Sequence, residues 1–427
     1  MDELFLGIDV GTSGCRAVAV DRQGQQRGLA VVSMAAPNRQ GAAIDQEPGI
    51  WWTGVEEALL ALLDQCDRQA VKAIAVDGTS GTLLLTDARG APLGPGLMYN
   101  DARSVDEAAR IKAVAPPDSG ALGTTSALAK LLHLQEKGQT KAAAHALHQA
   151  DWIAAQLSGR FGRSDQNNAL KLGYDVVEQC WPSWIGRLGL QPRLFPKVGV
   201  PGNSIGSISA ARARAFGLSS DVLIVSGTTD GVAAFLATGA ARPGDAVTSL
   251  GSTLVVKQLT SKPLFDASSG IYSHRLGHLW LPGGASNSGG AALSQFFDVE
   301  TMARLTPGLR PEQPTGLDFY PLPGVGERFP INDPEKPSMT SPRPRDDTVF
   351  LQALLEGIAS IEKLAYQRLQ KLGAPSLRSV RTVGGGAVNT AWTAIRRAYL
   401  GVPLLDADNT EAAFGAARLA KKGYDNA

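Results

Sequence analysis

The sequence predicts an α/β protein built from two related halves. Short apolar strands alternate with longer segments whose apolar residues recur every three or four positions, as in a helix that buries one face. A strand, a glycine turn with hydroxyl side chains and a second strand occur at 5–21, and the same order occurs again at 245–259. A repeat of this kind indicates a duplicated fold.

Length and composition are consistent with a globular enzyme or binding protein. A chain of 427 residues, 44% of them hydrophobic, can bury substantial cores and predicts two or three domains. The formal net charge of +1 gives no overall field that would attract nucleic acid or a membrane surface. The first residues lack the basic start of a signal peptide, and no apolar run approaches the ~20 residues of a membrane span. Cys15, Cys66 and Cys180 fit neither a disulfide framework nor a zinc cluster, so we expect a reducing, cytoplasmic location.

The first half has the pattern of a sheet covered by helices. Its predicted strands are the hairpin at 5–21, its continuation at 27–33, a short buried strand at 71–78 and a strand at 221–227 that ends on a glycine. Helical periodicity occurs at 50–69 and through much of 104–160. We place the domain boundary after this last strand, which gives a first domain at 1–227 and a second at 228–427.

The second half begins with a turn that enters a helix and continues with the repeated hairpin. Residues 307–344 contain ten of the 25 prolines, which predicts a long irregular excursion. A helix at 348–373, a strand within 379–387 and a final helix at 411–423 follow. The final helix is a candidate to pack back on the first domain.

Three glycine turns are candidates to bind phosphate, at 11–14, 251–253 and 384–387. Glycine leaves backbone N–H groups open to converge on an anion. None of the turns is a GxxxxGK[ST] loop or a GxGxxG fingerprint, and each alone is also compatible with an ordinary turn. Together, two hydroxyl-bearing hairpins could hold a polyphosphate while the third turn holds the base.

Two acids adjoin these turns, and the residues alone leave their roles open. Asp9 ends the first strand, where it could cap the turn by accepting N–H bonds or could face a metal bound to phosphate. Asp230 lies where a turn meets a helix, so it could be an idle helix N-terminal acid or a general base.

Segments along nearly the whole chain resemble the FGGY carbohydrate kinases. They include GIDVGTSGCRAVAVD, YNDAR, TTDGVAAFLATGA, GERFP and VGGGAVNTAWTAIRRAYLGVPL. Within that family, DGTSGTLLLTD and SDQNNALKLGYDV are most similar to the D-ribulose kinase group of cyanobacteria and plants. The resemblance implies two ribonuclease-H-like domains, of the actin, hexokinase and Hsp70 superfamily, around an ATP and sugar cleft.

The function that the resemblance implies is ATP-dependent phosphorylation of D-ribulose to D-ribulose 5-phosphate. The expected cofactors are ATP and Mg²⁺, and the expected partner is a small sugar, with no nucleic acid and no membrane. Another pentulose or a polyol, as in xylulokinases or glycerol kinases, is the alternative acceptor. A non-catalytic nucleotide switch of the actin type is less favoured, because that class lacks the YNDAR segment.

The resemblance also assigns roles to individual residues. Asp230 is the expected general base, and Asp9 the expected Mg²⁺ residue, directly or through water. The expected ATP and phosphate residues are Asp9, Gly11, Thr12, Ser13, Gly251, Ser252, Thr253, Gly384, Gly385, Gly386, Ala387 and Asn389. The expected substrate residues are Asp9, Ser80, Asp101, Arg103 and Asp230, with Asp77 and Asn100 as further candidates.

Two alternatives stay open in this assignment. Asp101 and Arg103 could instead form a mutual salt bridge on a loop. Trp51 and Trp52 could close the sugar side or anchor the core. The five histidines show no metal-ligand spacing, which predicts structural or surface positions for them.

Overall fold

The computed structural model describes residues 3–427, which divide into two compact units. The first unit runs to Ala237 and also contains Glu411–Ala427, and the second is Thr238–Thr410. The boundary predicted after residue 227 lies inside strand β13 (Leu223–Thr229). The next helix, α7 (Asp230–Ala237), belongs to the first unit because it packs against the C-terminal helix α12 (Ala412–Asp425).

The first unit is built on a six-stranded sheet in the order β12-β13-β6-β1-β2-β3. Strands β1, β2 and β3 form an antiparallel meander, whereas β6 and β13 run parallel to β1. The predicted hairpin and its continuation are therefore confirmed. The strands are β1 (Leu4–Val10), β2 (Gly14–Asp21), β3 (Gln26–Ser33), β6 (Val71–Gly78), β12 (Ser204–Ser207) and β13.

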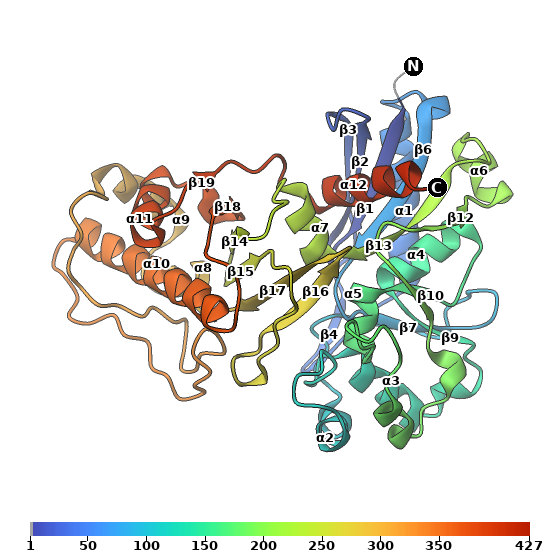
Figure 1. Ribbon diagram of the computed structural model, residues 1–427, viewed down its shortest axis with the longest axis horizontal. Helices are drawn as coiled ribbons and strands as arrows, with labels where there is room; N and C mark the ends of the chain where they lie inside the picture. The colour runs from blue at the N-terminus through green and yellow to red at the C-terminus, as the bar shows by residue number, and fades with distance from the viewer. Residues whose placement is uncertain (1–2) are drawn as a thin grey trace. The chain divides into compact units, whose positions relative to one another are not determined.

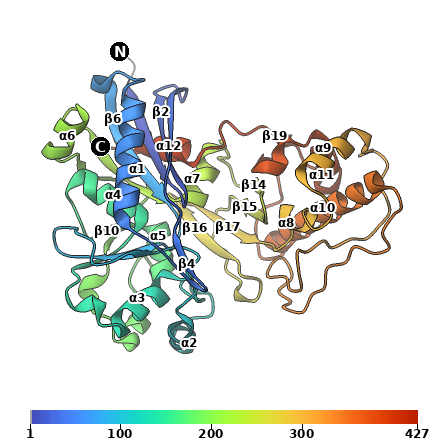
Figure 2. The same cartoon turned by 180° about the vertical axis from the view of Figure 1, so that it is seen from behind.

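Helices cover both faces of this sheet, as Figures 1 and 2 show for α1 (Pro48–Leu63) and α12. Alternate residues of a strand point to opposite faces. Accordingly, Leu6 of β1 joins the core that contains Trp51 of α1, and Phe5 joins the core that contains Leu419 of α12. Burial on both faces explains why β1 is apolar along its whole length until Asp9.

A second, five-stranded sheet in the first unit was not predicted. Its order is β4-β5-β8-β7-β9, and its strands have only two to four residues, too few to give a periodic pattern. The strands are β4 (Asn38–Gln40), β5 (Ala43–Gln46), β7 (Leu83–Thr86), β8 (Gly96–Leu97) and β9 (His145–His148). A separate two-stranded sheet consists of β10 (Arg163–Asp165) and β11 (Lys197–Gly199), which run parallel. The remaining helices of the unit are α2 (Val105–Val114), α3 (Ala127–Glu136), α4 (Gln149–Ser158), α5 (Gln166–Ala169) and α6 (Ala210–Phe216).

The second unit repeats the topology of the first. Its sheet has the order β16-β17-β15-β14-β18-β19, in which β14 pairs antiparallel with β15 and parallel with β18. The predicted duplication is therefore confirmed at the level of strand order. The strands are β14 (Asp245–Leu250), β15 (Leu254–Gln258), β16 (Tyr272–Leu276), β17 (Leu279–Ala285), β18 (Ser379–Val383) and β19 (Leu404–Leu405).

Helix α10 (Asp347–Lys371), predicted at 348–373, organises the core of the second unit (Figure 1). Its buried Glu362 accepts two hydrogen bonds from the buried Arg396 guanidinium, at 2.6 and 2.7 Å. Removing one partner of such a pair costs about 3–5 kcal/mol, because the other charge is left buried alone. The other helices of this unit are α8 (Gly290–Leu293), α9 (Val299–Leu305) and α11 (Thr390–Leu400).

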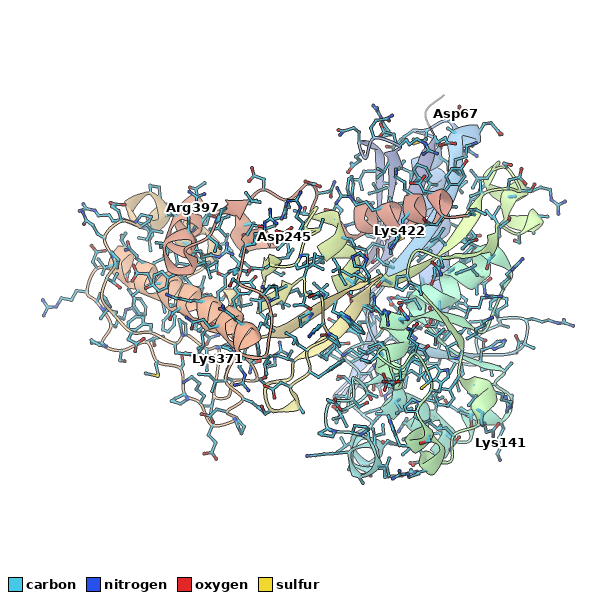
Figure 3. All side chains as sticks on the ribbon, viewed as in Figure 1. Asp67, Lys141, Asp245, Lys371, Arg397 and Lys422 are labelled. Carbon is cyan, nitrogen blue, oxygen red and sulfur yellow. The ribbon has the colours of Figure 1, made fainter. Side chains whose placement is uncertain are left out.

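The β14–β18 pair is fastened where it begins. Asp245 starts β14, as labelled in Figure 3, and its carboxylate accepts a hydrogen bond from the Ser379 hydroxyl at 2.9 Å. The same carboxylate accepts the Arg242 N–H at 3.0 Å, so strand and preceding turn share one anchor. The proline-rich stretch between Gly308 and Asp347 contains no helix or strand, as predicted.

Among residues 3–427, no helix combines the length and apolar character needed to cross a membrane. Cys15 is buried, Cys66 half-buried and Cys180 exposed, and all three are free thiols.

Candidate active site

Three carboxylates gather at one edge of the first unit's sheet. Asp9 of β1 and Asp77 of β6 are direct partners in the parallel pairing of these strands. Thr228 of β13 pairs with Asp77, and Asp230 follows it at the start of α7. Because parallel strands end at the same edge, the register brings acids from three separate segments together.

A cavity of about 410 Å³ lies at this edge, and Asp9 and Asp230 both line it. Gly11 and Thr12 line it from the β1–β2 turn, where the Gly11 N–H donates to the Gly14 carbonyl oxygen at 2.9 Å. Thus Asp9, Gly11, Thr12 and Asp230, four of the predicted residues, share one cavity. Ser13 belongs to the same turn but is exposed and does not line the cavity.

The charges of these acids are coupled. Burial raises the pKa of Asp77 well above its ordinary value, and the negative charges of Asp9 and Asp230 raise it further. Burial also raises the pKa of Asp9, although the guanidinium of Arg16, 3.5 Å away, acts in the opposite direction. A bound cation would favour the charged forms of these acids, so the group suits a site that receives a cation.

The segment after β6 is held rigidly beside the cavity. Thr79, which lines the cavity, donates from its N–H and its hydroxyl to the Gln149 side-chain oxygen, at 3.0 and 2.8 Å. The fully buried Lys130 donates from Nζ to the carbonyl oxygens of Gly81 at 2.7 Å and Thr125 at 2.9 Å. The loop that carries Ser80 is therefore fixed at both of its ends.

The polar atoms that are buried without a hydrogen-bond partner within residues 3–427 include Ser80 Oγ and Asn100 Oδ1, both in the predicted substrate segments. A buried polar group without a partner costs about 1–3 kcal/mol, so such atoms indicate a bound polar ligand or water. Tyr99, the residue next to Asn100, lines the cavity.

Asp101 and Arg103 form a salt bridge with each other, which is the alternative to substrate binding that the sequence left open for this pair. The fully buried Asp101 carboxylate accepts the Arg103 Nε–H at 2.8 Å and the Ile44 N–H at 2.6 Å. Arg103 also donates to the Asp45 carboxylate at 2.8 Å. Neither Asp101 nor Arg103 lines the cavity, so their visible contacts fix the loop before α2.

The second unit contains a larger cavity of about 870 Å³. Gly251 and Ser252 line it from the β14–β15 turn, and Gly385, Gly386 and Asn389 line it from the turn after β18. Its remaining wall is largely apolar, which suits a flat heteroaromatic ring. The apolar lining residues include Leu293, Val299, Met302, Leu351, Leu355 and Trp392.

Two glycines of the second turn, Gly384 and Gly386, are required by geometry. Gly384 has φ of +88°, a conformation that L side chains rarely adopt. A Cβ on Gly386 would lie 2.7 Å from side-chain atoms of Leu250 and Trp392. Thr253, Gly384 and Ala387 lie in these turns but do not line the cavity.

Asn389 also has a structural role, because its side-chain oxygen caps α11 by accepting the Trp392 N–H at 2.9 Å. Its side-chain nitrogen donates to the Thr306 hydroxyl at 3.2 Å.

The acidic edge offers few protein ligands for a metal ion. Within residues 3–427, no three His, Cys, Asp or Glu side chains are placed to hold a metal ion together. Mg²⁺ commonly binds through one or two carboxylates and the oxygens of a phosphate substrate, and keeps several waters. The acidic edge with Asp9 on the cavity wall fits that mode of binding.

Several residues of the site were missed from the sequence. Thr79 and Tyr99 lie inside the quoted segments DGTSG and YNDAR, next to predicted residues, so including every polar side chain of these two segments would have found them. Lys130 and Gln149 lie on helices α3 and α4, and no local pattern marks them as contacts of the 78–82 loop.

Comparison with known protein families gives two matches that together span most of the chain. Residues 4–237 match the N-terminal domain of the FGGY family of carbohydrate kinases, and residues 246–423 match its C-terminal domain.

Individual relatives are kinases of small sugars. A xylulose kinase of Streptomyces coelicolor is 28% identical over 423 residues, covering 94% of this chain and 84% of the relative. A xylulose kinase of Escherichia coli K12 is 24% identical, covering 98% of this chain and 90% of the relative. Among solved structures, one described as a xyloylose kinase from Brucella ovis has a TM-score of 0.90 at 26% identity, over 100% of this chain and 91% of that one. Glycerol kinase of Plasmodium falciparum with ADP has a TM-score of 0.87 at 16% identity, over 100% and 90% respectively, and shows the fold alone.

Proposed function

We propose that this chain, which belongs to the FGGY family of carbohydrate kinases, transfers the γ-phosphoryl group of ATP to the 5-hydroxyl of D-ribulose. That it is a sugar phosphotransferase follows from the family. The observation that carries the proposed chemistry is the cavity lined by Asp9 and Asp230, which lies beside buried polar atoms without partners.

Asp230 is the proposed general base. Its carboxylate lines the cavity, and one of its oxygens accepts the Gly231 N–H at 2.6 Å, which fixes its orientation. During transfer, a bond forms between the sugar hydroxyl oxygen and the γ-phosphorus, and the bond to the bridging oxygen of ADP breaks. Asp230 accepts the hydroxyl proton. Such transfers depend mainly on positioning and on stabilising charge, so aligning the hydroxyl is as important as accepting its proton.

Asp9 is the proposed residue for Mg²⁺, directly or through water. The carboxylate lies on the cavity wall at the base of the β1–β2 turn, and Arg16 contacts it on one side. Mg²⁺, when bound, supplies positive charge that offsets the charge of the phosphates. Gly11 and Thr12 line the same wall and are proposed to contact phosphate oxygens.

The 870 Å³ cavity of the second unit is the proposed nucleotide site. Its volume falls within the ~300–1,000 Å³ of typical ligand pockets. Its apolar wall would hold the base, while Gly251 and Ser252 would contact phosphate.

The choice of D-ribulose rests on the loop DGTSG at 77–81. Ser80 Oγ and Asn100 Oδ1 are buried without partners, and hydroxyls of a sugar would satisfy them. D-Xylulose is the second candidate, because both relatives described above are xylulose kinases. The two sugars differ only in the direction of the C3 hydroxyl.

The test is steady-state kinetics with ATP, Mg²⁺ and a panel of D-ribulose, L-ribulose, D-xylulose and glycerol. We expect the highest kcat/KM for D-ribulose. One mismatched buried polar group lowers kcat/KM by about tenfold to a hundredfold, which is the margin expected over D-xylulose. Ser80→Ala should reduce this margin by impairing D-ribulose more. A preference of the parent protein for D-xylulose would overturn the proposed acceptor and leave the kinase assignment intact.

A further inference from the structure

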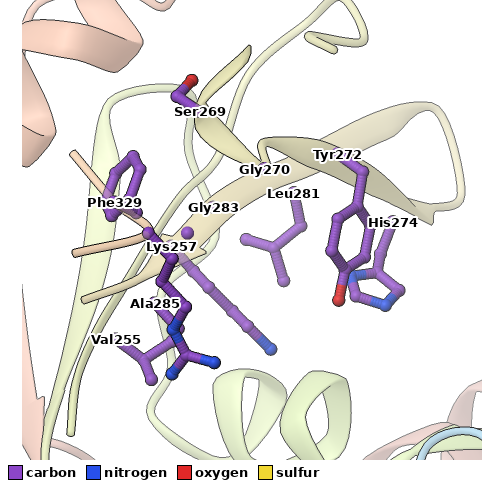
Figure 4. Close-up of a pocket in the computed structure, with 12 residues that line it drawn as sticks. Val255, Lys257, Ser269, Gly270, Tyr272, His274, Leu281, Gly283, Ala285 and Phe329 are labelled. Carbon is purple, nitrogen blue, oxygen red and sulfur yellow. The ribbon is translucent and has the colours of Figure 1, made fainter. Parts of the chain in front are cut away.

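A separate pocket lies on one face of the second unit's sheet. It has a volume of about 220 Å³ and shares no lining residue with the 870 Å³ cavity. Lys257 of β15, Gly283 of β17 and Tyr272 of β16 are partners across three adjacent strands, so they form one row of the pocket. Figure 4 shows Lys257, Tyr272 and His274 projecting to the same side of the sheet. With no side chain on Gly283, this row has room for a ligand.

Arg328 enters the pocket from the proline-rich stretch, and both neighbours hold its backbone. On one side, the buried Glu327 carboxylate accepts the Ser286 hydroxyl at 2.6 Å and the Asn287 N–H at 2.7 Å. On the other, the buried Phe329 ring packs on Gly284, where a Cβ would lie only 2.6 Å from it. The contacts of Glu327 and Phe329 therefore fix the position of the Arg328 backbone between them.

The Arg328 guanidinium has no partner in residues 3–427. The residue is exposed and lines the pocket, and its side chain makes no hydrogen bond or ion pair within the described chain. A guanidinium presents five N–H donors in a planar fork that matches phosphate and carboxylate oxygens. The neighbouring Glu327 does not pair with this guanidinium, because its carboxylate accepts hydrogen bonds from Ser286, Asn287 and Tyr320 instead.

The two charged side chains among the residues that line the pocket, Lys257 and Arg328, are both basic. No Asp or Glu is among the residues that line the pocket. The Tyr272 hydroxyl adds a further polar group on the same wall. At about 220 Å³ the pocket is smaller than the ~300–1,000 Å³ that drug-sized ligands occupy, which indicates a small ligand or one end of a larger one.

We propose that this pocket is a second ligand site, which binds the phosphoryl group of a small metabolite between Arg328 and Lys257. The group could belong to a sugar phosphate, such as the product of the proposed reaction, or could be free inorganic phosphate. The site requires none of the residues to which the proposed function assigns catalysis or nucleotide binding.

The test is calorimetric titration of the full-length chain in the absence of ATP. The ligands are D-ribulose 5-phosphate, inorganic phosphate and uncharged D-ribulose. The variants are Arg328→Gln and Lys257→Gln, with Arg345→Gln as the control, because Arg345 is an exposed arginine of the same unit that lines none of the described cavities. Unchanged thermal unfolding of each variant establishes that it is folded.

We expect parent and Arg345→Gln to bind a phosphorylated ligand at this pocket, and Arg328→Gln and Lys257→Gln each to weaken that binding about tenfold to a hundredfold. Binding of both phosphorylated ligands identifies the phosphoryl group as sufficient, and binding of the sugar phosphate alone identifies the sugar phosphate as the ligand. Equal affinity and stoichiometry in Arg328→Gln and Arg345→Gln would overturn the proposal, as would equal Arg328-dependent binding of uncharged D-ribulose. Since no ATP is present, the titration does not test the proposed kinase reaction, which the steady-state assay tests separately.

Discussion

The side-chain nitrogen of Lys130 lies 2.7 Å from the carbonyl oxygen of Gly81 and so ties helix α3 to the loop that carries Ser80. Lys130 is completely buried, and its second acceptor is the Thr125 carbonyl oxygen. A buried lysine is expensive, since burial disfavours its charged form. Its position therefore indicates that holding this loop matters to the site.

We expect Lys130→Met, which keeps a long unbranched side chain, to raise the KM for the pentulose by about tenfold while the KM for ATP stays within twofold. The reason is that the loop bearing Ser80 loses an anchor worth about 1–2 kcal/mol. Steady-state kinetics with each substrate varied in turn measures the effect. A parallel rise of both KM values would mean that the lysine supports the fold generally and not the sugar loop.

The same lysine predicts a pH dependence of stability. Burial lowers the pKa of Lys130 from 10.5 to about 7. Between these values the unfolded chain binds the proton that the folded chain has released, so the free energy of unfolding should rise with pH across this window. The rise should be smaller in Lys130→Met. Lys137→Met, which removes an exposed lysine at the end of the same helix, is the control. Denaturant unfolding near pH 7 and near pH 10 measures the free energy of unfolding of each protein. The same change of this free energy with pH in all three proteins would contradict the burial of an uncharged lysine.

Asp230→Asn should lower kcat by about two to four orders of magnitude with little change in ligand affinity. The amide keeps the shape of the side chain but cannot accept the proton of the acceptor hydroxyl. Rapid-mixing measurement of the chemical step is the most direct check. If turnover stays within tenfold of the parent, Asp230 is a helix N-terminal acid without a catalytic role.

Asp9→Asn should raise the Mg²⁺ concentration for half-maximal rate by at least about tenfold, and should also lower the saturating rate. The physical reason is the loss of one negative charge from the cavity wall while Arg16 remains beside it. A magnesium titration of both proteins gives the comparison. An unchanged midpoint together with an unchanged maximal rate would assign Asp9 to the turn alone.

Gly386→Ala should weaken ATP binding, whereas Gly385→Ala should not. A Cβ at 386 would lie 2.7 Å from atoms of Leu250 and Trp392, which line the 870 Å³ cavity, and overpacking of this kind costs about 1–3 kcal/mol. A Cβ at 385 meets nothing within 4 Å. The KM for ATP of the two variants is the measurement. Equal values would show that this turn does not shape the nucleotide site.

Elements with a strong pattern could be predicted from the sequence, and those without one could not. The hairpin at 5–21 and helix α10 have long runs of regular periodicity, so both were found. The strands β4, β5, β7, β8 and β9 are too short to show a period, and the pairs β5–β8 and β7–β9 join segments that are far apart in the sequence. The boundary was placed before α7 because nothing local shows that this helix packs on α12.

The candidate site follows the same division. Asp9, Gly11 and Thr12 lie at the end of β1 and in the turn that follows it, and Asp230 begins α7, so their types and spacing could be recognised in the sequence. That Asp77 pairs directly with Asp9 depends on strand register, which the sequence does not state. The mutual contact of Asp101 and Arg103 likewise depends on the path of their loop.

The most direct test of the central proposal is phosphorus NMR of a reaction containing the protein, ATP, Mg²⁺ and D-ribulose. We predict that the γ-phosphate signal of ATP is replaced by a phosphomonoester signal coupled to the two C5 protons of ribulose, with one ADP formed per sugar phosphate, and that Asp230→Asn abolishes this signal over the same period. Release of inorganic phosphate without a sugar ester, or an ester formed equally by Asp230→Asn, would contradict the account.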